Sequence, residues 1–160
     1  MAKVSSYIDD LCCHFLCTRQ SLGVKASDSN SIFVGNIVVI RSDIDSNGDI
    51  EDDASILNRP YRVNFSNIKS IKIANEHPKF ILIVEKMTVF EDLLSQRFHR
   101  QFPCVVKTGG GEPSLDCRMF VRMVWETLQV PVFALVDCNP AGFEIYKTIA
   151  VSILWWPGAK

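Results

Sequence analysis

Short, uninterrupted apolar runs mark the C-terminal half of this 160-residue chain. The first covers residues 80–84, a second precedes Thr108, and the third covers residues 132–136. Because the runs do not alternate with polar residues, each predicts a strand buried on both faces, as in a parallel sheet covered by helices. We therefore expect an α/β fold with a doubly wound, mostly parallel sheet. Helical patterns lie between the runs and after the last one, at Thr88–Arg100, Pro113–Leu128 and Phe143–Ile149.

An acidic residue directly follows the first and the third run: Glu85 and Asp137. The C-terminal ends of parallel strands lie along one edge of a sheet, where ligands collect, so we expect the two side chains to share that edge. Neighbouring carboxylates repel each other unless one is protonated or a cation lies between them. Mg²⁺ suits such a pair because it binds one or two carboxylates together with water and phosphate oxygens. In a simpler interpretation, each acid only stabilises the N-terminus of the next helix.

Several motifs resemble, in order and spacing, the Toprim domain of the A subunit of topoisomerase VI and of its eukaryotic relatives that make the double-strand breaks of meiotic recombination. The similarity is greatest to the meiotic branch and covers most of the chain to about Ile149. Upstream motifs resemble the segment that joins the family's winged-helix domain to its Toprim domain: residues 8–10, 18–19, 22–24 and 34–35. The Toprim motifs are residues 83–86, 97–98, 102–109, 111–113, 118–122, 128–131, 135–140 and 142–143.

The resemblance implies a Toprim-type, Rossmann-like core with an N-terminal helix and a β-hairpin linker before it. We expect residues 1–78 to be the linker to a winged-helix domain and residues 79–149 to be the Toprim core. Residues 150–160 depart from the family as an apolar tail that contains Trp155 and Trp156 and either caps the sheet or lies exposed.

The family's activity is DNA transesterification, in which a tyrosine attacks a phosphodiester while Toprim-bound Mg²⁺ stabilises charge and positions the phosphate. The resemblance assigns Glu85 and Asp137 as metal-binding acids. The family reads Asp-x-Asp at the third position, whereas this chain has Asn139. An amide oxygen still binds a hard cation but brings no charge, so we expect a weakened site, with complete loss of metal as the alternative. Asn139 is also a typical turn residue before Pro140.

The family's nucleophilic tyrosine lies in an Arg-Arg-Asp-x-Tyr-Tyr motif on the winged-helix domain, and no tyrosine of this chain has that context. Tyr7, Tyr61 and Tyr146 have other neighbours, so we expect the nucleophile to be absent here. Two functions fit. One is the metal-binding component of a type IIB topoisomerase-like DNA-cleaving complex, and the other is a non-catalytic DNA- or partner-binding remnant. The resemblance further implies DNA as ligand, a homodimer, the nucleus as the location and, as a possible partner, an ATPase B-type subunit.

A net charge of −1 provides no global attraction for DNA, so contacts would come from local groups. Glycines at Gly109, Gly110 and Gly111 open the second helix and predict either a phosphate-binding turn or a plain tight turn. Further candidates for phosphate contact are Lys86, Arg118 and Arg122, and the arginine clusters are also typical of solvated helix faces.

Two other metal motifs are poorer matches. Residues 12–17 contain Cys12, Cys13, His14 and Cys17 but lack the paired Cys-x-x-Cys spacing of zinc sites. Residues 43–50 match the start of an EF-hand loop, but the twelfth position is Ala54 instead of glutamate, and the preceding residues 32–40 predict a strand instead of a helix. A polar hairpin loop is therefore the better interpretation. The chain shows no signal peptide and no apolar stretch of membrane-spanning length, so we expect an intracellular protein with its six cysteines reduced.

Overall fold

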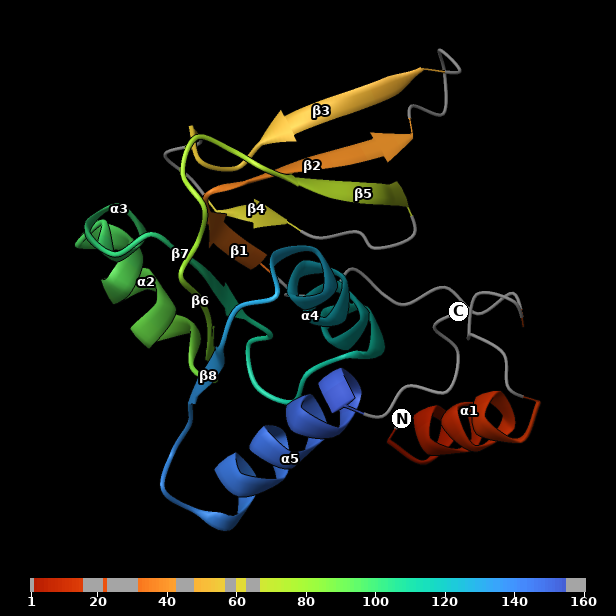
Figure 1. The fold of residues 1–160 in the computed structure, drawn as a ribbon. Helices are drawn as coiled ribbons and strands as arrows, with labels where there is room; N and C mark the ends of the chain where they lie inside the picture. Colours follow the sequence, from red (N-terminus) through yellow and green to blue (C-terminus); the bar gives the residue numbers. More distant parts are fainter. Residues whose placement is uncertain are drawn as a thin grey trace.

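The computed structural model describes residues 2–15, 22, 32–42, 48–56, 60–62 and 67–154. Helices cover both faces of a central sheet, and a smaller sheet lies beside it (Figure 1). The helices are α1 (Ala2–Phe15), α2 (Met87–Ser95), α3 (Phe98–Gln101), α4 (Leu115–Leu128) and α5 (Pro140–Leu154). The strands are β1 (Ile32–Gly35), β2 (Ile37–Ser42), β3 (Asp49–Asp53), β4 (Tyr61–Arg62), β5 (Ile68–Ile73), β6 (Phe80–Val84), β7 (Cys104–Thr108) and β8 (Val132–Leu135).

The central sheet has the strand order β4-β1-β7-β6-β8. The three apolar runs form β6, β7 and β8, which are parallel to one another, and β6 lies in the middle with Ile83 opposite Lys107 and Ala134. Strands β1 and β4 extend the sheet in the antiparallel sense beyond β7. This mixed α/β architecture with a parallel centre confirms the predicted Toprim-type fold class.

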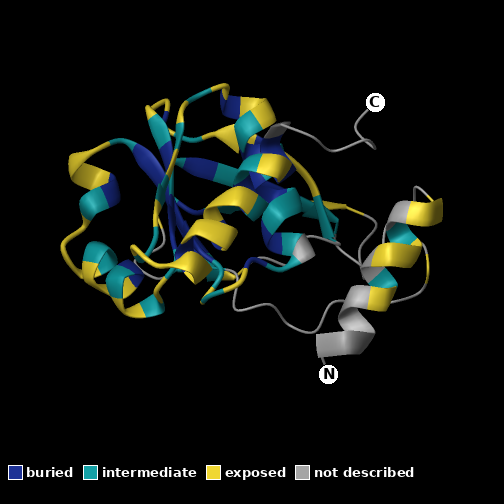
Figure 2. Cartoon of the chain, turned by 90° about the horizontal axis from the view of Figure 1, so that it is seen from below, coloured by how far each residue is buried: buried dark blue, intermediate teal, exposed yellow. Residues whose placement is uncertain are grey.

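Side chains alternate between the two faces of β6 and fill two cores. Ile81 and Ile83 pack with α4 and α5 on one face, whereas Leu82 and Val84 pack with α2 and α3 on the other. Figure 2 shows the buried residues concentrated in the strands and on the inner sides of these helices. Burial on both faces explains why β6 and β7 read as continuous apolar runs in the sequence. For the third run the prediction was wrong, because β8 is at the edge of the sheet and exposes Phe133 and Leu135.

The segment 32–40, which the sequence predicts as one strand, is two strands in two sheets. The break is at Gly35, whose φ of 149° lies in the region that favours glycine. A Cβ at this position would lie 2.4 Å from the carbonyl oxygen of Cys104, so the close approach of β1 to β7 requires glycine. Beyond Asn36, β2 pairs with β3 and β5 in the second, antiparallel sheet, which we call the hairpin sheet.

The EF-hand-like motif joins the antiparallel strands β2 and β3, with Ser42 opposite Asp49. An EF-hand needs helices on both sides of its loop, so the flanking strands favour the hairpin interpretation. Residues 43–47 of the loop lie outside the described residues.

The single helix predicted for residues 88–100 is broken after Ser95. Arg97 adopts a left-handed conformation with φ of 53°, and the chain turns there into the short helix α3. The turn is held locally, since the backbone N–H of Gln96 and the hydroxyl of Ser95 both donate to the carbonyl oxygen of Asp92. The turn brings Phe98 into ring contact with Phe80 of β6, at 6.5 Å between centroids.

Helix α5 continues through residue 150, where the sequence predicts the start of the tail, and reaches Leu154. Ile153 is buried in the core with α4, whereas Val151 is exposed. Trp155 and Trp156 lie outside the described residues. Among the described residues, no helix combines the length and apolar character needed to cross a membrane.

Candidate functional site: the acidic edge of the parallel sheet

Glu85 and Asp137 lie together at the C-terminal edge of the parallel strands. The backbone N–H of Glu85 donates to the carbonyl oxygen of Leu135 at 3.0 Å, which extends the β6–β8 pairing past the end of β6. In turn, the backbone N–H of Asp137 donates to Glu85 Oε2 at 2.8 Å. We call Glu85, Lys86, Asp137 and Asn139 the acidic edge. The two acids are 52 positions apart in the sequence, and the α2-α3-β7-α4-β8 path between them returns to the same edge.

Lys86 supplies the positive charge of this edge. Its Nζ lies 2.8 Å from Asp137 Oδ2, and both side chains are partly exposed to solvent. The hydrogen bond to Asp137, together with the charges of Asp137 and Glu85, raises the pKa of Lys86 above its ordinary value. The ammonium is therefore paired with Asp137 and influenced by the charge of Glu85, and the three side chains together carry a net negative charge.

Asn139 caps helix α5. Its Oδ1 accepts a hydrogen bond from the backbone N–H of Gly142 at 2.8 Å, and its carbonyl oxygen accepts one from Phe143 at 3.1 Å. Such a cap satisfies donors at the helix start that have no partner within the helix. The structure therefore favours the interpretation of Asn139 as a turn residue. A cation bound to Oδ1 would have to share this oxygen with the backbone N–H of Gly142.

Gly142 lets the start of α5 approach the acidic edge. A Cβ on this residue would lie 2.2 Å from the carbonyl oxygen of Asp137, a distance that side-chain carbons do not adopt. The position of Asp137 therefore depends on glycine in the first turn of α5. In the sequence, Gly142 was noted only as part of a motif of the resemblance. Its close approach to the carbonyl oxygen of Asp137 is a property of the folded backbone that a sequence pattern does not reveal.

The turn formed by residues 109–111, which we call the glycine turn, is hydrogen-bonded to the end of β6. The backbone N–H of Gly111 donates to the carbonyl oxygen of Glu85 at 3.1 Å, and that of Gly110 donates to the Thr108 hydroxyl at 3.1 Å. Both glycines have positive φ, 118° and 67°. Two amides that a bound phosphate would need thus already have partners within the chain, which favours the tight-turn interpretation and gives the turn a role in holding Glu85.

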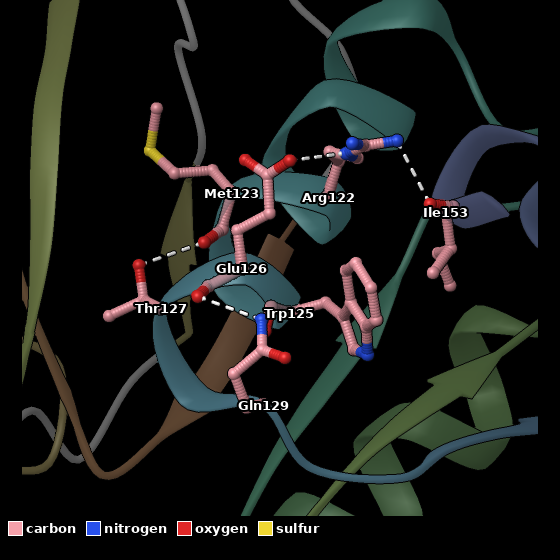
Figure 3. Close-up of polar contacts among 7 residues, drawn as sticks. All are labelled: Arg122, Met123, Trp125, Glu126, Thr127, Gln129 and Ile153. Atoms are coloured by element: carbon pink, nitrogen blue, oxygen red, sulfur yellow. Dashed lines mark hydrogen bonds and ion pairs between the residues drawn. The ribbon is translucent and has the colours of Figure 1, made fainter. Parts of the chain in front are cut away.

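The two arginine candidates of α4 differ in their surroundings. Arg122 bridges two helices, since its guanidinium donates to the carboxylate of Glu126 at 2.6 Å and to the carbonyl oxygen of Ile153 at 2.9 Å (Figure 3). Ile153 is near the C-terminal end of α5, roughly 20 Å along the helix from its start at the acidic edge. Arg118 lies one turn closer to the glycine turn, and its Nε is buried with no hydrogen-bond partner among the described residues.

The three tyrosines have different surroundings. Tyr61 donates its hydroxyl to Asp52 Oδ2 at 2.8 Å, and burial together with this hydrogen bond raises the pKa of Tyr61 to about 12. Tyr7 on α1 and Tyr146 on α5 are largely exposed. The phenol of Tyr61 is therefore held in its neutral form at physiological pH.

A buried lysine beside the site went unnoticed in the sequence. Lys107 of β7 is only 1% exposed, and its Nζ lies 5.2 Å from the ring centroid of Phe120. Burial lowers the pKa of Lys107 below its ordinary value. The only sequence signal was a charged residue at the end of an apolar run.

The donor chemistry of the acidic edge fits a hard cation. Glu85 and Asp137 offer carboxylate oxygens from two neighbouring strand ends, which is the set that Mg²⁺ uses together with water and phosphate. No group of three or more His, Cys, Asp and Glu side chains suitable for a metal occurs among the described residues, so a site at the acidic edge would contain two acids at most. Of the zinc candidate, Cys12 and His14 lie on α1, and Cys17 lies outside the described residues.

Comparison with known proteins points to one family. The family model of the Toprim domain shared by Spo11 and the A subunit of topoisomerase 6 matches residues 80–154. "Meiotic recombination protein SPO11" of Mus musculus is 37% identical over 145 residues, which are 90% of this chain and 35% of that protein. The A subunit of DNA topoisomerase 6 from Arabidopsis thaliana is 34% identical over 138 residues, or 86% of this chain and 31% of that protein. The chain thus spans about a third of the length of these relatives. Residues 80–154 are therefore a Toprim domain of the family that comprises Spo11 and the A subunit of topoisomerase 6.

Proposed function

We propose that this chain is the metal- and DNA-binding component of a type IIB topoisomerase-like complex that makes DNA double-strand breaks in meiotic recombination. The observation that carries the proposal is the 2.8 Å contact between Asp137 and Glu85, which joins the two acids at the strand ends of a Toprim domain. The names of the similar proteins, a meiotic recombination protein and a topoisomerase subunit, support the same class of activity.

In this proposal, Glu85 and Asp137 hold Mg²⁺, and Asn139 contributes a weak third oxygen. The bound cation would neutralise charge on a DNA phosphate and position it. Other residues of the chain would hold the two acids in position for the cation. The glycine turn fixes the backbone of Glu85, and the cap of α5 fixes the loop that carries Asp137.

Positively charged groups around the edge would contact the DNA backbone. Lys86 lies at the edge, and Arg118 lies on the first turns of the helix that follows the glycine turn. We keep Gly109, Gly110 and Gly111 and Arg122 as possible contacts, although Gly110 and Gly111 would have to exchange internal hydrogen bonds and Arg122 is engaged at the far end of α5. The acidic edge repels phosphate without a cation, so DNA and metal should bind together.

The proposed complex contains a second copy of this protein and works in the nucleus. The resemblance implies a homodimer, but a second copy of this chain brings the same three tyrosines, so the nucleophile would have to come from outside this chain. An ATPase B-type subunit is a further candidate partner.

A non-catalytic DNA- or partner-binding role is the second candidate. Asn139 favours it, because a neutral side chain stands where the family has an acid and its oxygen already caps α5. The ion pair of Lys86 with Asp137 favours it too, because that carboxylate already has a positive partner.

Magnesium titration calorimetry tests the metal site. We expect weak binding that Glu85→Gln abolishes and that Asn139→Asp strengthens, since aspartate restores a charge and also serves as a helix cap. Asp53→Asn is a suitable control because Asp53 belongs to the hairpin sheet and accepts hydrogen bonds from the nearby Ser55. Equal affinity in the unchanged protein and the Glu85 and Asn139 variants would reject the site and leave the non-catalytic role.

A plasmid assay tests the absence of a nucleophile. The chain alone, incubated with supercoiled DNA and Mg²⁺, should produce neither nicks nor covalent protein–DNA adducts. Each of Tyr7→Phe, Tyr61→Phe and Tyr146→Phe should behave identically. An adduct that one of these changes removes would identify a nucleophile in this chain and contradict the expectation.

A further inference from the structure

Three side-chain oxygens of the acidic edge already have donors within the chain. Glu85 Oε2 accepts from the backbone N–H of Asp137, Asn139 Oδ1 accepts from Gly142, and Asp137 Oδ2 binds the ammonium of Lys86. Of these three donors only Lys86 is charged and has a flexible side chain, because the other two are backbone amides fixed by the fold. A cation that enters the edge therefore meets one movable competitor.

We propose that Lys86 is a resident counter-ion of the acidic edge, which a divalent cation displaces from Asp137 and which then binds the DNA phosphate. This inference rests on the proposed metal site and adds how metal and DNA become coupled there. Lys86 occupies the position just before α2 with an extended backbone (φ −90°, ψ 131°), directly after Glu85. Lys86 thus follows β6, whereas Asp137 follows the neighbouring strand β8. The ammonium of Lys86 spans the distance between these two strand ends.

Electrostatics gives the displacement its direction. A divalent cation carries twice the charge of the ammonium and interacts with both carboxylates at once, whereas the ammonium of Lys86 is paired with Asp137. The side chain of Lys86 is half-exposed, so its release requires no opening of the core. Once released, the ammonium remains tethered next to the cation, where a phosphate oxygen on the metal would be the nearest unpaired negative group.

The proposal makes two opposite predictions for one substitution. Without DNA, Lys86→Gln should bind Mg²⁺ about two- to fivefold more tightly, which is the range expected for loss of one exposed competing ion pair. With Mg²⁺ present, the same variant should bind a short DNA duplex more weakly and with a shallower salt dependence, because one phosphate contact is lost. A residue that only shapes the edge would move both affinities in the same direction.

Titration calorimetry with Mg²⁺ and fluorescence anisotropy with a short duplex measure the two affinities on the whole chain. Lys147→Gln is the matched control. It removes the same charge from another exposed ion pair, with Glu144 on α5 at 3.1 Å, and should leave both affinities unchanged. Lys86→Arg keeps the charge and should retain the unchanged protein's Mg²⁺ affinity.

Outcomes separate this inference from the metal site on which it rests. If Glu85→Gln abolishes Mg²⁺ binding while Lys86→Gln leaves it equal or weaker, the metal site stands and the counter-ion role is overturned. If Glu85→Gln and Lys86→Gln both leave Mg²⁺ binding unchanged, the metal site and the counter-ion role both fall. Tighter Mg²⁺ binding together with weaker DNA binding in Lys86→Gln, and in neither control, would support the proposal.

Discussion

The acidic edge and the exposed face of the hairpin sheet neutralise their carboxylates in different ways. On the hairpin sheet, each acid of three ion pairs between strands has its own cation. Glu51 of β3 lies 2.7 Å from Lys72 of β5, on the far side of the middle strand β2. Asp49 and Lys69 join the same two strands, whereas Asp52 of β3 pairs with Arg41 of the adjacent strand β2.

At the acidic edge, the carboxylates of Glu85 and Asp137 lie near one lysine, Lys86, which is paired with Asp137. Antiparallel strands set side chains side by side on a sheet, so long lysine and arginine side chains can reach an acid on a neighbouring or next-neighbouring strand. Parallel strand ends instead bring together residues that follow different strands, and nothing in that geometry supplies a cation for each acid. Of the two regions, the acidic edge is therefore the one where an added divalent cation would neutralise the most unbalanced negative charge.

The largest effect is expected from Gly142→Ala, which breaks the acidic edge from within. The new Cβ would lie 2.2 Å from the carbonyl oxygen of Asp137, so the loop or the start of α5 must move. Overpacking of this kind destabilises a protein by roughly 1–3 kcal/mol, and we expect Mg²⁺ binding to be lost as well. Urea denaturation and titration calorimetry measure the two losses.

Gly109→Ala is the control for that change. Its Cβ would meet its nearest neighbours, including Sγ of Cys117, at ordinary distances of 3.5 Å or more. A similar loss of stability in both variants would show that glycine at position 142 has no special role in the approach of α5 to Asp137.

Asp52→Asn should weaken the hairpin sheet without affecting the acidic edge. Asp52 accepts hydrogen bonds from Arg41 and from the Tyr61 hydroxyl, so its replacement should cost about 1–2 kcal/mol. Mg²⁺ affinity should stay unchanged. Altered Mg²⁺ binding in this variant would mean that the two regions are coupled and that the comparison fails.

The hydrogen bond from Tyr61 to Asp52 also predicts that the stability of the fold decreases at alkaline pH. The pKa of Tyr61 is raised to about 12 in the folded protein, first by burial and then by Asp52, against roughly 10 in an unfolded chain. The unfolded state therefore loses this proton first, and the stability contributed by neutral Tyr61 is present below pH 10 and is lost between about pH 10 and pH 12. In Asp52→Asn, spectrophotometric titration should show a lower Tyr61 pKa and denaturation should show a smaller alkaline loss. An unchanged pKa would contradict the contribution of Asp52.

The smallest effect is expected from Lys72→Gln, which removes one exposed pair of the hairpin sheet. Exposed ion pairs contribute about 0–1 kcal/mol, so thermal unfolding should shift little and Mg²⁺ affinity should not change. A large loss of stability would show that the ion pairs of this sheet act as a network instead of separate surface contacts.

Local patterns in the sequence were sufficient for the parallel centre of the fold and for its pair of acids. Apolar runs without polar alternation made β6, β7 and β8 recognisable, although β8 is exposed on one face, and the topology of parallel strands then placed Glu85 and Asp137 at one edge. The position of α4 followed from the same reasoning, whereas α5 begins three residues before the predicted start at Phe143.

Contacts between distant segments decided the rest. The chain bends at Gly35 because β1 must approach Cys104, and Arg97 turns left-handed because α3 must return Phe98 to β6. Asn139 caps α5 and Arg122 binds its far end, although both residues looked like candidate ligands in the sequence. Sequence patterns report which residue types favour a strand, a helix or a charge cluster, whereas the partner of each polar atom depends on which segments the fold brings within hydrogen-bond distance.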